Sequence, residues 1–379
     1  IYYYDLRVVN SSLKNYSNFI LAMVMLILAF PVFFRRNKGF DLPAKFILFS
    51  VLFSILMSVV AWDQSIGQSI KATAPYTYFS IYFYLISRRF PPEKLEDILL
   101  VFGLTYSVLF FYQLLTNAIP AIVRVDEFIE ERGIVRVIFP GLGVFYLAVF
   151  MGLCRMNSKS VKGLIWGLMA LLGVVVTVLQ VTRQSYIAVF LILLFHFTRR
   201  LKPVTRYIAM GALTSLIAIF LASTSNPLVR GLIEDSKKDK ELGTSNVRLE
   251  AAKYYAFEFQ PGPVQRLFGN GVPYALESTY ARRVNYLEKA LGFYLTDIGL
   301  VAVYFLFGLL PVFSFLLIWL IGFRSRLEDK WMYPKYFLFF LLITSLTSDY
   351  IYSVDFLSST AIALYIFQVR RLPAGRLIV

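Results

Sequence analysis

The chain has 379 residues, of which 58% are hydrophobic and only 16% are charged, whereas soluble domains carry about 25% charged residues. A soluble fold of this length could not bury so much apolar surface, so the composition excludes a soluble globular protein and indicates a polytopic membrane protein. A single cysteine and a single histidine exclude internal disulfides and leave no Cys/His cluster for a metal ion. We therefore expect neither a metal nor another cofactor.

Apolar stretches follow one another along the chain, most of them close to the length of about 17–25 residues that a transmembrane helix needs. We expect spans at roughly 17–34, 43–62, 74–88, 97–119, 138–154, 163–181, 184–199, 207–222, 291–321, 335–348 and 356–369. The predicted fold class is an all-α polytopic membrane protein with about eleven transmembrane helices. The predicted division is an N-terminal transmembrane bundle at 1–222, a large loop with short helices at 223–290, and C-terminal transmembrane helices at 291–379.

Short basic connections between these stretches predict the orientation. The formal charge is +15, and the basic residues fall largely at 35–38, 88–94, 155–162, 199–202, 324–335 and 370–376. If the spans alternate, these connections share one face, which the positive-inside rule assigns to the cytoplasm. The loop 223–290 then lies outside. Nucleic acid is not an expected partner, because no basic patch with interleaved aromatic residues stands outside the membrane.

The start of the chain carries a further expectation. In this arrangement the first residues lie outside, and the chain begins with Ile1 rather than methionine. We therefore expect one more helix upstream in the full-length protein, which would give twelve helices and place the N-terminus inside.

The polar stretch 223–290 is the largest interruption of the apolar pattern. It holds ten Lys/Arg, eight Asp/Glu and a Gly-Asn-Gly turn at Gly269–Gly271. Loops on a rigid scaffold commonly carry function, so this loop is the expected place for the chemistry. Within it, 230–245 is expected to be a solvated spacer. The parts expected to work are Arg248–Gly271 and Arg282–Asp297.

Arginines in the outer connections are the candidate ligands for a phosphate-bearing substrate. Guanidinium groups bind phosphate oxygens bidentately and stay charged in any surroundings. The candidates are Arg132, Arg136, Arg183, Arg248, Arg266, Arg282 and Arg283. The alternative is that several of them anchor at lipid headgroups or pair with loop carboxylates. The acidic cluster at 126–131 is expected to be a solvated helix face.

Almost no charge falls in the middle of a predicted span. Arg183, Asp297, Asp349 and Asp355 map to outer helix ends, whereas ion-coupled transporters keep such charges near the midplane. This favours an outward-facing site over an alternating-access pathway. His196 lies at the opposite end of a span, and we interpret it as an interfacial side chain that reaches for lipid headgroups.

Four short motifs stand in a fixed order around the long loop. Thr182-Arg183-Gln184-Ser185 lies between two apolar stretches, and Asn246–Ala252 is followed by Leu267–Gly271. Leu295–Val301 then opens the next span, and Arg132 and Arg136 precede a mid-chain helix. In order and spacing, over roughly 130–305, these motifs resemble those of the bacterial O-antigen polymerase and ligase superfamily (Wzy-like proteins).

The resemblance implies a GT-C-like glycosyltransferase of the bacterial inner membrane with a periplasmic loop. It would polymerise polyprenyl-diphosphate-linked oligosaccharide repeat units of O-antigen, capsule or exopolysaccharide. The implied partners are undecaprenyl-diphosphate-linked oligosaccharide, membrane lipids and a chain-length regulator protein. Family ligases carry a His-Asn pair about eleven residues before the first glycine of the closing motif, where this chain has Glu288-Lys289. This favours a polymerase, while a ligase acting on lipid A core or a flippase of lipid-linked sugars stays as the alternative.

The implied reaction needs cations at the leaving diphosphate and a base for the acceptor hydroxyl. The expected diphosphate ligands are Arg183 and Arg248 first, then Arg136 and Arg266. Glu288 is the first candidate for the base and Asp297 the second. In the alternative interpretation, Glu288 is a charge favoured at a helix N-terminus and Asp297 pairs two helices.

Overall fold

The computed structural model describes residues 11–116, 127–131, 134–138, 140–157, 161–180, 182–199, 204, 211, 247–259, 262–274 and 278–371. Of residues 11–18, 116, 127–131 and 134–136 it describes the backbone alone. The predicted span 207–222, apart from the helical Gly211, the spacer 230–245 and Arg132 lie outside the described residues. The predicted division into 1–222, 223–290 and 291–379 stays a prediction.

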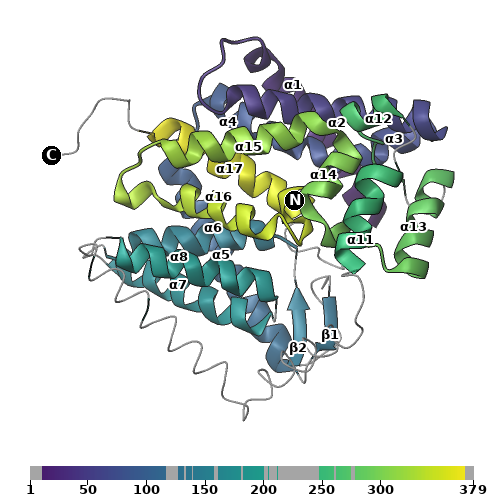
Figure 1. Ribbon diagram of the computed structural model, residues 1–379. Coiled ribbons are helices and arrows are strands. Elements are labelled where there is room, and N and C mark those ends of the chain that lie inside the picture. The colour runs from purple at the N-terminus through teal and green to yellow at the C-terminus, as the bar shows by residue number, and fades with distance from the viewer. Residues whose placement is uncertain are drawn as a thin grey trace.

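The described chain is mostly helical (Figure 1). Its longer helices are α1 (Ser11–Phe33), α2 (Asp41–Trp62), α5 (Pro92–Thr116), α6 (Leu142–Arg155), α7 (Val161–Leu179), α8 (Arg183–Thr198), α15 (Leu309–Arg324), α16 (Tyr333–Thr344) and α17 (Val354–Arg370). Among the described residues, Asp41–Trp62, Pro92–Leu115 and Val161–Leu179 are long and apolar enough to cross a membrane. Shorter apolar helices lie at Phe19–Phe33, Leu142–Arg155, Arg183–Thr198, Leu309–Arg324 and Tyr333–Thr344.

Short elements connect or extend these helices. They are α3 (Ile66–Thr73), η1 (Ala74–Ser80), α4 (Ile81–Arg88), α11 (Val247–Lys253), the π-helix η2 (Tyr254–Glu258), α12 (Pro263–Phe268), α13 (Thr279–Leu291), η3 (Leu295–Asp297), α14 (Gly299–Phe307), η4 (Asp329–Trp331) and η5 (Asp349–Ile351). The predicted span 74–88 is therefore a 3-10 helix followed by a short α-helix. The predicted span 291–321 begins as α-helix only at Gly299, where α14 starts, and is broken at Gly308, between α14 and α15.

Helix α6 forms the centre of the core. Every residue from Leu142 to Leu153 is buried, and the helix packs against α5, α7, α16 and α17. Close approach depends on small residues, since a Cβ on Gly152 would lie 2.7 Å from the Trp166 carbonyl oxygen of α7. Burial on all sides explains why the α6 sequence is apolar all round rather than along one stripe.

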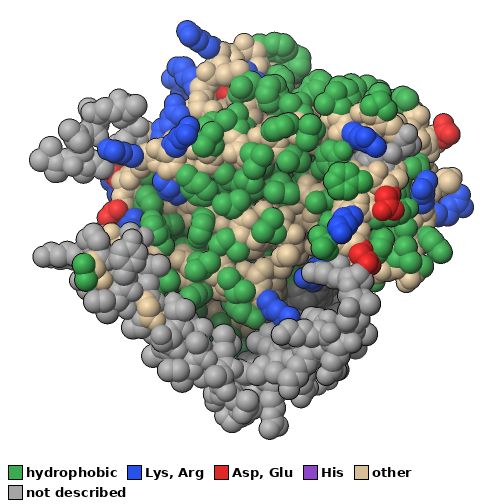
Figure 2. Space-filling view, in the orientation of Figure 1, with side chains coloured by type: hydrophobic (Ala, Val, Ile, Leu, Met, Phe, Trp, Pro, Cys, Tyr) green, Lys and Arg blue, Asp and Glu red, His purple; other side chains and the backbone are tan. Residues whose placement is uncertain are grey.

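One end of the molecule gathers the basic connections, and we call it the basic end. Arg155 forms an ion pair with Glu96 at 2.7 Å, and Arg370 forms one with Glu93. Both guanidinium groups also lie over the Trp331 ring, at 4.5 and 4.2 Å from its centroid. Figure 2 shows an apolar band that separates charged side chains at the left of the view from those on α11–α13 at the right. We call that opposite end the loop end.

Two expectations from the sequence were wrong. The acidic stretch Glu127–Glu131 is strand β1, paired antiparallel with β2 (Ile134–Ile138), and not a helix face. The β-branched run of β2 favours a pleated hairpin over a helix, so the described part of the chain contains a hairpin beside its helices. His196 is buried, with Nδ1 3.0 Å from the Tyr336 hydroxyl. His196 therefore does not reach for lipid headgroups. It can pack between helices because the Tyr336 hydroxyl is its polar partner.

Candidate functional site

The Gly-Asn-Gly turn lies in the break between α14 and α15. Asn270 is fully buried and donates its backbone N–H (2.8 Å) and its side-chain amide (3.1 Å) to the Phe305 carbonyl oxygen. The backbone N–H of Gly271 donates to the Leu306 carbonyl at 2.9 Å. An unbroken helix would supply these donors from four residues ahead, and here the turn replaces them. The turn is therefore a structural joint.

A buried glutamine fixes the chain that follows the turn. Gln64, just after α2, donates its amide to Ser69 Oγ (3.2 Å) and to the Val272 carbonyl (3.0 Å). Its Oε1 accepts from the Tyr274 N–H and from the Ser278 hydroxyl, each at 3.0 Å. All four hydrogen-bonding positions of the amide are used, so the start of α13 is held against α2 and α3.

The start of α14 is held against the end of α16. Gly299 has φ of +38°, and a side chain there would overlap the Ser345 carbonyl, which accepts from the Leu300 N–H at 2.8 Å. This close approach requires glycine at 299. It places Asp297, in the preceding 3-10 turn, at the loop end.

Arg248 and Asp297 form an ion pair at this end, with Nε 3.3 Å from Oδ2. The side chains are 52% and 38% exposed. Exposed pairs of this kind contribute about 0–1 kcal/mol to stability. The pair therefore holds α11 to η3 weakly and leaves the guanidinium accessible to a second anion.

Glu288 is a carboxyl group at this end with a displaced pKa. It lies on α13, and partial burial raises its pKa above the usual range, although its carboxylate accepts a hydrogen bond from the Leu295 N–H, which opposes the rise. The alternative interpretation, a charge favoured at a helix N-terminus, does not hold, because Glu288 lies in the last turn of α13.

Two buried tyrosines lie within the electrostatic reach of these carboxylates. The Tyr255 hydroxyl donates to the Phe293 carbonyl at 3.1 Å, and burial followed by the Glu288 charge raises its pKa. The Tyr352 hydroxyl donates to the Leu295 carbonyl at 3.0 Å. Its pKa is raised by burial first and then by Asp349, with smaller effects of Glu288 and Asp297. Glu288 therefore influences both tyrosines, and Asp349 and Asp297 influence Tyr352 as well.

Tyr255 belongs to the π-helix η2. Single turns of π-helix are rare and occur often at functional sites. This turn brings Tyr255, Phe259 and the aromatic face of α14 together, since the Tyr255 ring lies 4.7 Å from that of Phe305.

The arginines on α12 and α13 differ in their surroundings. Arg283 lies over the rings of Phe259 (4.7 Å) and Trp62 (5.5 Å), an arrangement that orients its guanidinium by cation–π attraction. Arg282 is exposed and lies 3.4 Å from the Thr279 hydroxyl. Arg266 is exposed on α12.

The Thr182–Ser185 motif begins α8 at the same end. Gln184 Oε1 accepts from the Thr347 hydroxyl at 2.9 Å, and the Ser185 hydroxyl donates to Tyr350 Oη at 3.3 Å. Both partners lie in the connection that contains η5, which also contacts η3. Arg183 is partly buried at this helix start. The motif is thus connected through η5 to the element that carries Asp297.

The structure says less about the two remaining candidates, Arg132 and Arg136. The Arg136 backbone lies on β2 opposite Ile129, and Arg132 lies outside the described residues. The structure thus places Glu288 near the Arg248–Asp297 pair, and Arg183, Arg266, Arg282 and Arg283 lie on other elements of the loop end. The described part of the chain contains no group of three or more His, Cys, Asp or Glu residues that could hold a metal ion.

Sequence reasoning missed Gln64, Tyr255 and Tyr352. Glutamine after a span looks like any connection residue, and tyrosines crowd the ends of most spans as interfacial anchors. The sequence offered one signal for Tyr352. Asp349 stands close to tyrosines at an outer helix end, and Glu288 also stands close to a tyrosine.

A scan of the chain against protein-family models finds no match, and a search of curated proteins also finds none.

Proposed function

We propose that the protein is a metal-independent membrane glycosyltransferase that polymerises polyprenyl-diphosphate-linked oligosaccharide repeat units. The observation that carries the proposal is the half-buried Glu288, with its raised pKa, on the same end as the Arg248–Asp297 pair. A carboxylate with a raised pKa suits a general base. Accessible guanidinium groups suit a diphosphate. The motif resemblance supports the same reaction and the GT-C-like class.

In the proposed reaction, a hydroxyl of the acceptor sugar attacks the anomeric carbon of the donor sugar. The new glycosidic C–O bond forms as the bond from that carbon to the diphosphate breaks, and polyprenyl diphosphate leaves with the electron pair. Glu288 takes the proton of the attacking hydroxyl. Arg248 and Arg183 stabilise the charge that grows on the diphosphate, and Asp297 positions Arg248.

The break between α14 and α15 bears on the transporter alternative. Broken helices in transporters expose carbonyl groups that coordinate ions. Here the Phe305 and Leu306 carbonyls accept from Asn270 and Gly271. The break is therefore filled by the protein's own loop, which favours an enzyme.

The proposed setting is the bacterial inner membrane with the loop end in the periplasm, and undecaprenyl diphosphate is the proposed carrier. Incubating purified protein with a defined undecaprenyl-diphosphate oligosaccharide tests the function. A ladder of repeat units is the expected product. Transfer to added lipid A core instead would make the protein a ligase, and absence of any transfer under conditions where the protein stays folded would contradict the proposal.

A further inference from the structure

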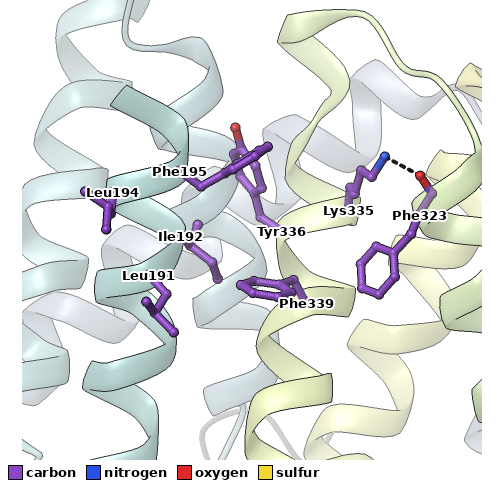
Figure 3. Close-up of a pocket in the computed structure, with 8 residues that line it drawn as sticks. All are labelled: Leu191, Ile192, Leu194, Phe195, Phe323, Lys335, Tyr336 and Phe339. Carbon is purple, nitrogen blue, oxygen red and sulfur yellow. Dashed lines mark hydrogen bonds between the residues drawn. The ribbon is translucent and has the colours of Figure 1, made fainter. Parts of the chain in front are cut away.

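An apolar groove lies between α8 and the pair α15 and α16, away from the proposed site. Its volume is about 410 Å³. Figure 3 shows the α8 side chains on one side and those of α15 and α16 on the other. The lining residues are Leu191, Ile192, Leu194, Phe195, Phe323, Lys335, Tyr336 and Phe339. Lys335 is the single charged residue among them.

The groove lies toward the basic end. Phe323 is the next-to-last residue of α15, and Lys335 is the third residue of α16. The rings of Phe195 and Phe323 are 40% and 39% exposed, so apolar surface is left uncovered by the described residues. In a membrane-embedded bundle, such a surface meets hydrocarbon chains.

Lys335 lines this groove on the side of the basic end, which we call the mouth, and has one donor to spare within the described part of the chain. Its ammonium group donates to the Phe323 carbonyl at 3.0 Å and to the Ser325 carbonyl at 3.2 Å, at the C-terminus of α15. An ammonium group has three N–H donors. Two are used by the helix end, and the third can reach an acceptor at the groove mouth.

The connection beside the mouth has an excess of positive charge. Between Arg324 and Lys335 four cations (Arg324, Arg326, Lys330, Lys335) face two carboxylates, Glu328 and Asp329. Glu328 pairs with Lys330 at 3.0 Å, and Asp329 pairs with Arg199 at 3.2 Å. Arg324 and Arg326 are exposed and form no ion pair within the described part of the chain.

We propose that this groove binds one acyl chain of an anionic phospholipid, whose phosphate lies at Lys335 and the Arg324–Arg326 segment. The apolar lining accounts for the chain, and the cations that form no ion pair with a described residue account for the negative headgroup, as in other basic pockets between membrane helices. The volume falls within the range of small-ligand pockets. The proposal requires membrane embedding but not the glycosyl-transfer reaction.

A tryptophan placed in the groove tests this directly. The Phe339→Trp protein is reconstituted in phosphatidylcholine nanodiscs. These contain brominated phosphatidylglycerol or brominated phosphatidylcholine at the same series of mole fractions. The quenching of the parent's four tryptophans is measured separately and subtracted. We expect brominated phosphatidylglycerol to reach half-maximal quenching at a mole fraction about fivefold lower than brominated phosphatidylcholine does. This is the enrichment that one basic residue near the surface gives. Adding Lys335→Gln and Arg324→Gln should remove the preference.

Val101→Trp is the matched control, because Val101 is an exposed α5 residue away from the groove. It should be quenched equally by both lipids, which also shows that the bundle is embedded. Equal quenching of Phe339→Trp by both lipids would overturn the headgroup assignment. No quenching of Phe339→Trp, with normal quenching of the control, would show that protein fills the groove. If Phe339→Trp does not fold, native mass spectrometry of the parent decides: one retained phosphatidylglycerol, lost in the Lys335→Gln, Arg324→Gln variant, supports the proposal, and none overturns it.

Discussion

Asn270 directs two donors, its backbone N–H and its side-chain amide, at a single acceptor, the Phe305 carbonyl oxygen. Its own Oδ1 accepts from the Trp62 indole at 3.2 Å. One side chain thus joins α2, the polar loop and the broken helix α14–α15. Because the joint is buried, the loop elements that carry Glu288 and Arg248 are fixed to the bundle.

The joint predicts a strong effect of Gly308→Ala. Gly308 has φ of +84° and ψ of −170°, a region that is open almost to glycine alone, and a Cβ there would overlap the Leu267 carbonyl. We expect a loss of more than about 3 kcal/mol in the free energy of unfolding, measured as thermal unfolding in detergent.

Gly167→Ala is the control for this substitution. Gly167 lies within α7, and the nearest atom to its added Cβ is 3.7 Å away. This change should be neutral or stabilising by about 1 kcal/mol, since alanine favours a helix interior. Equal stability of the two variants would contradict the structural role of the break.

The helical, apolar character of the described chain could be predicted from the sequence, while the number of about eleven spans stays a prediction and the breaks within the helices could not be foreseen. Basic residues between spans predicted which connections share an end, and Arg155, Arg199 and Arg370 lie together at the basic end. Gly308 is one glycine in a long apolar run, and glycines in such runs commonly serve helix packing instead. The helix breaks at Gly308 where Asn270, from the polar loop, donates to the Phe305 carbonyl in place of the helix's own N–H, and this contact has no local signal in the sequence.

Loss of Arg248 from the Arg248–Asp297 pair should lower the activity of the protein without lowering its stability. Arg248→Gln should change the unfolding temperature little, because the pair is exposed. Loss of a charged contact to the diphosphate costs about 1.5–3 kcal/mol, so polymer formation should fall about 10- to 100-fold. The measurement is initial rate of ladder formation by purified protein.

A charge exchange provides the control for this pair. The double variant Arg248→Asp, Asp297→Arg restores an ion pair between α11 and η3 but places the cation elsewhere. We expect normal stability and low activity. Recovery of full activity in the double variant would show that Arg248 serves only to hold the two elements together.

Glu288 predicts a pH dependence. Its pKa is raised by burial, and a general base must be ionised, so the rate should rise with pH through this raised pKa and then level off. Glu288→Gln should lower the rate by about 10²- to 10⁴-fold and abolish the rise. A normal rate for Glu288→Gln would remove Glu288 from the mechanism, and the rate of Asp297→Asn would then test the second candidate.

The same shift has a consequence for stability. Because the folded-state pKa lies above the unfolded value, the folded protein holds the proton more tightly, and the stabilisation by the protonated form is lost as pH rises through the folded-state pKa. Glu288→Gln keeps an oxygen acceptor for the Leu295 N–H without the charge. The variant should therefore unfold at a higher temperature than the parent near neutral pH and at an equal temperature in acid. A lower unfolding temperature at neutral pH would contradict the burial of the carboxyl group.

The candidate site was predictable in its residue types but not in its pairings. Arginines and carboxylates outside the spans were visible, but Arg248 and Asp297 are 49 positions apart, and their contact needs long-range packing such as that of Gly299 against Ser345. The tyrosines were indistinguishable from interfacial anchors, since burial of Tyr255 and Tyr352 depends on elements from three separate stretches. Contacts of this range are set by tertiary packing and leave no local pattern.

The two ends of the bundle predict opposite accessibilities in cells. In a Cys154→Ser background, Lys289→Cys lies on α13 at the loop end and Lys330→Cys on η4 at the basic end, and both positions are exposed. A membrane-impermeant maleimide should label Lys289→Cys in intact cells and label Lys330→Cys only after permeabilisation, because the positive-inside rule predicts that the basic end faces the cytoplasm. The reverse result would place Glu288 and Arg248 in the cytoplasm and contradict polymerisation on the outer face.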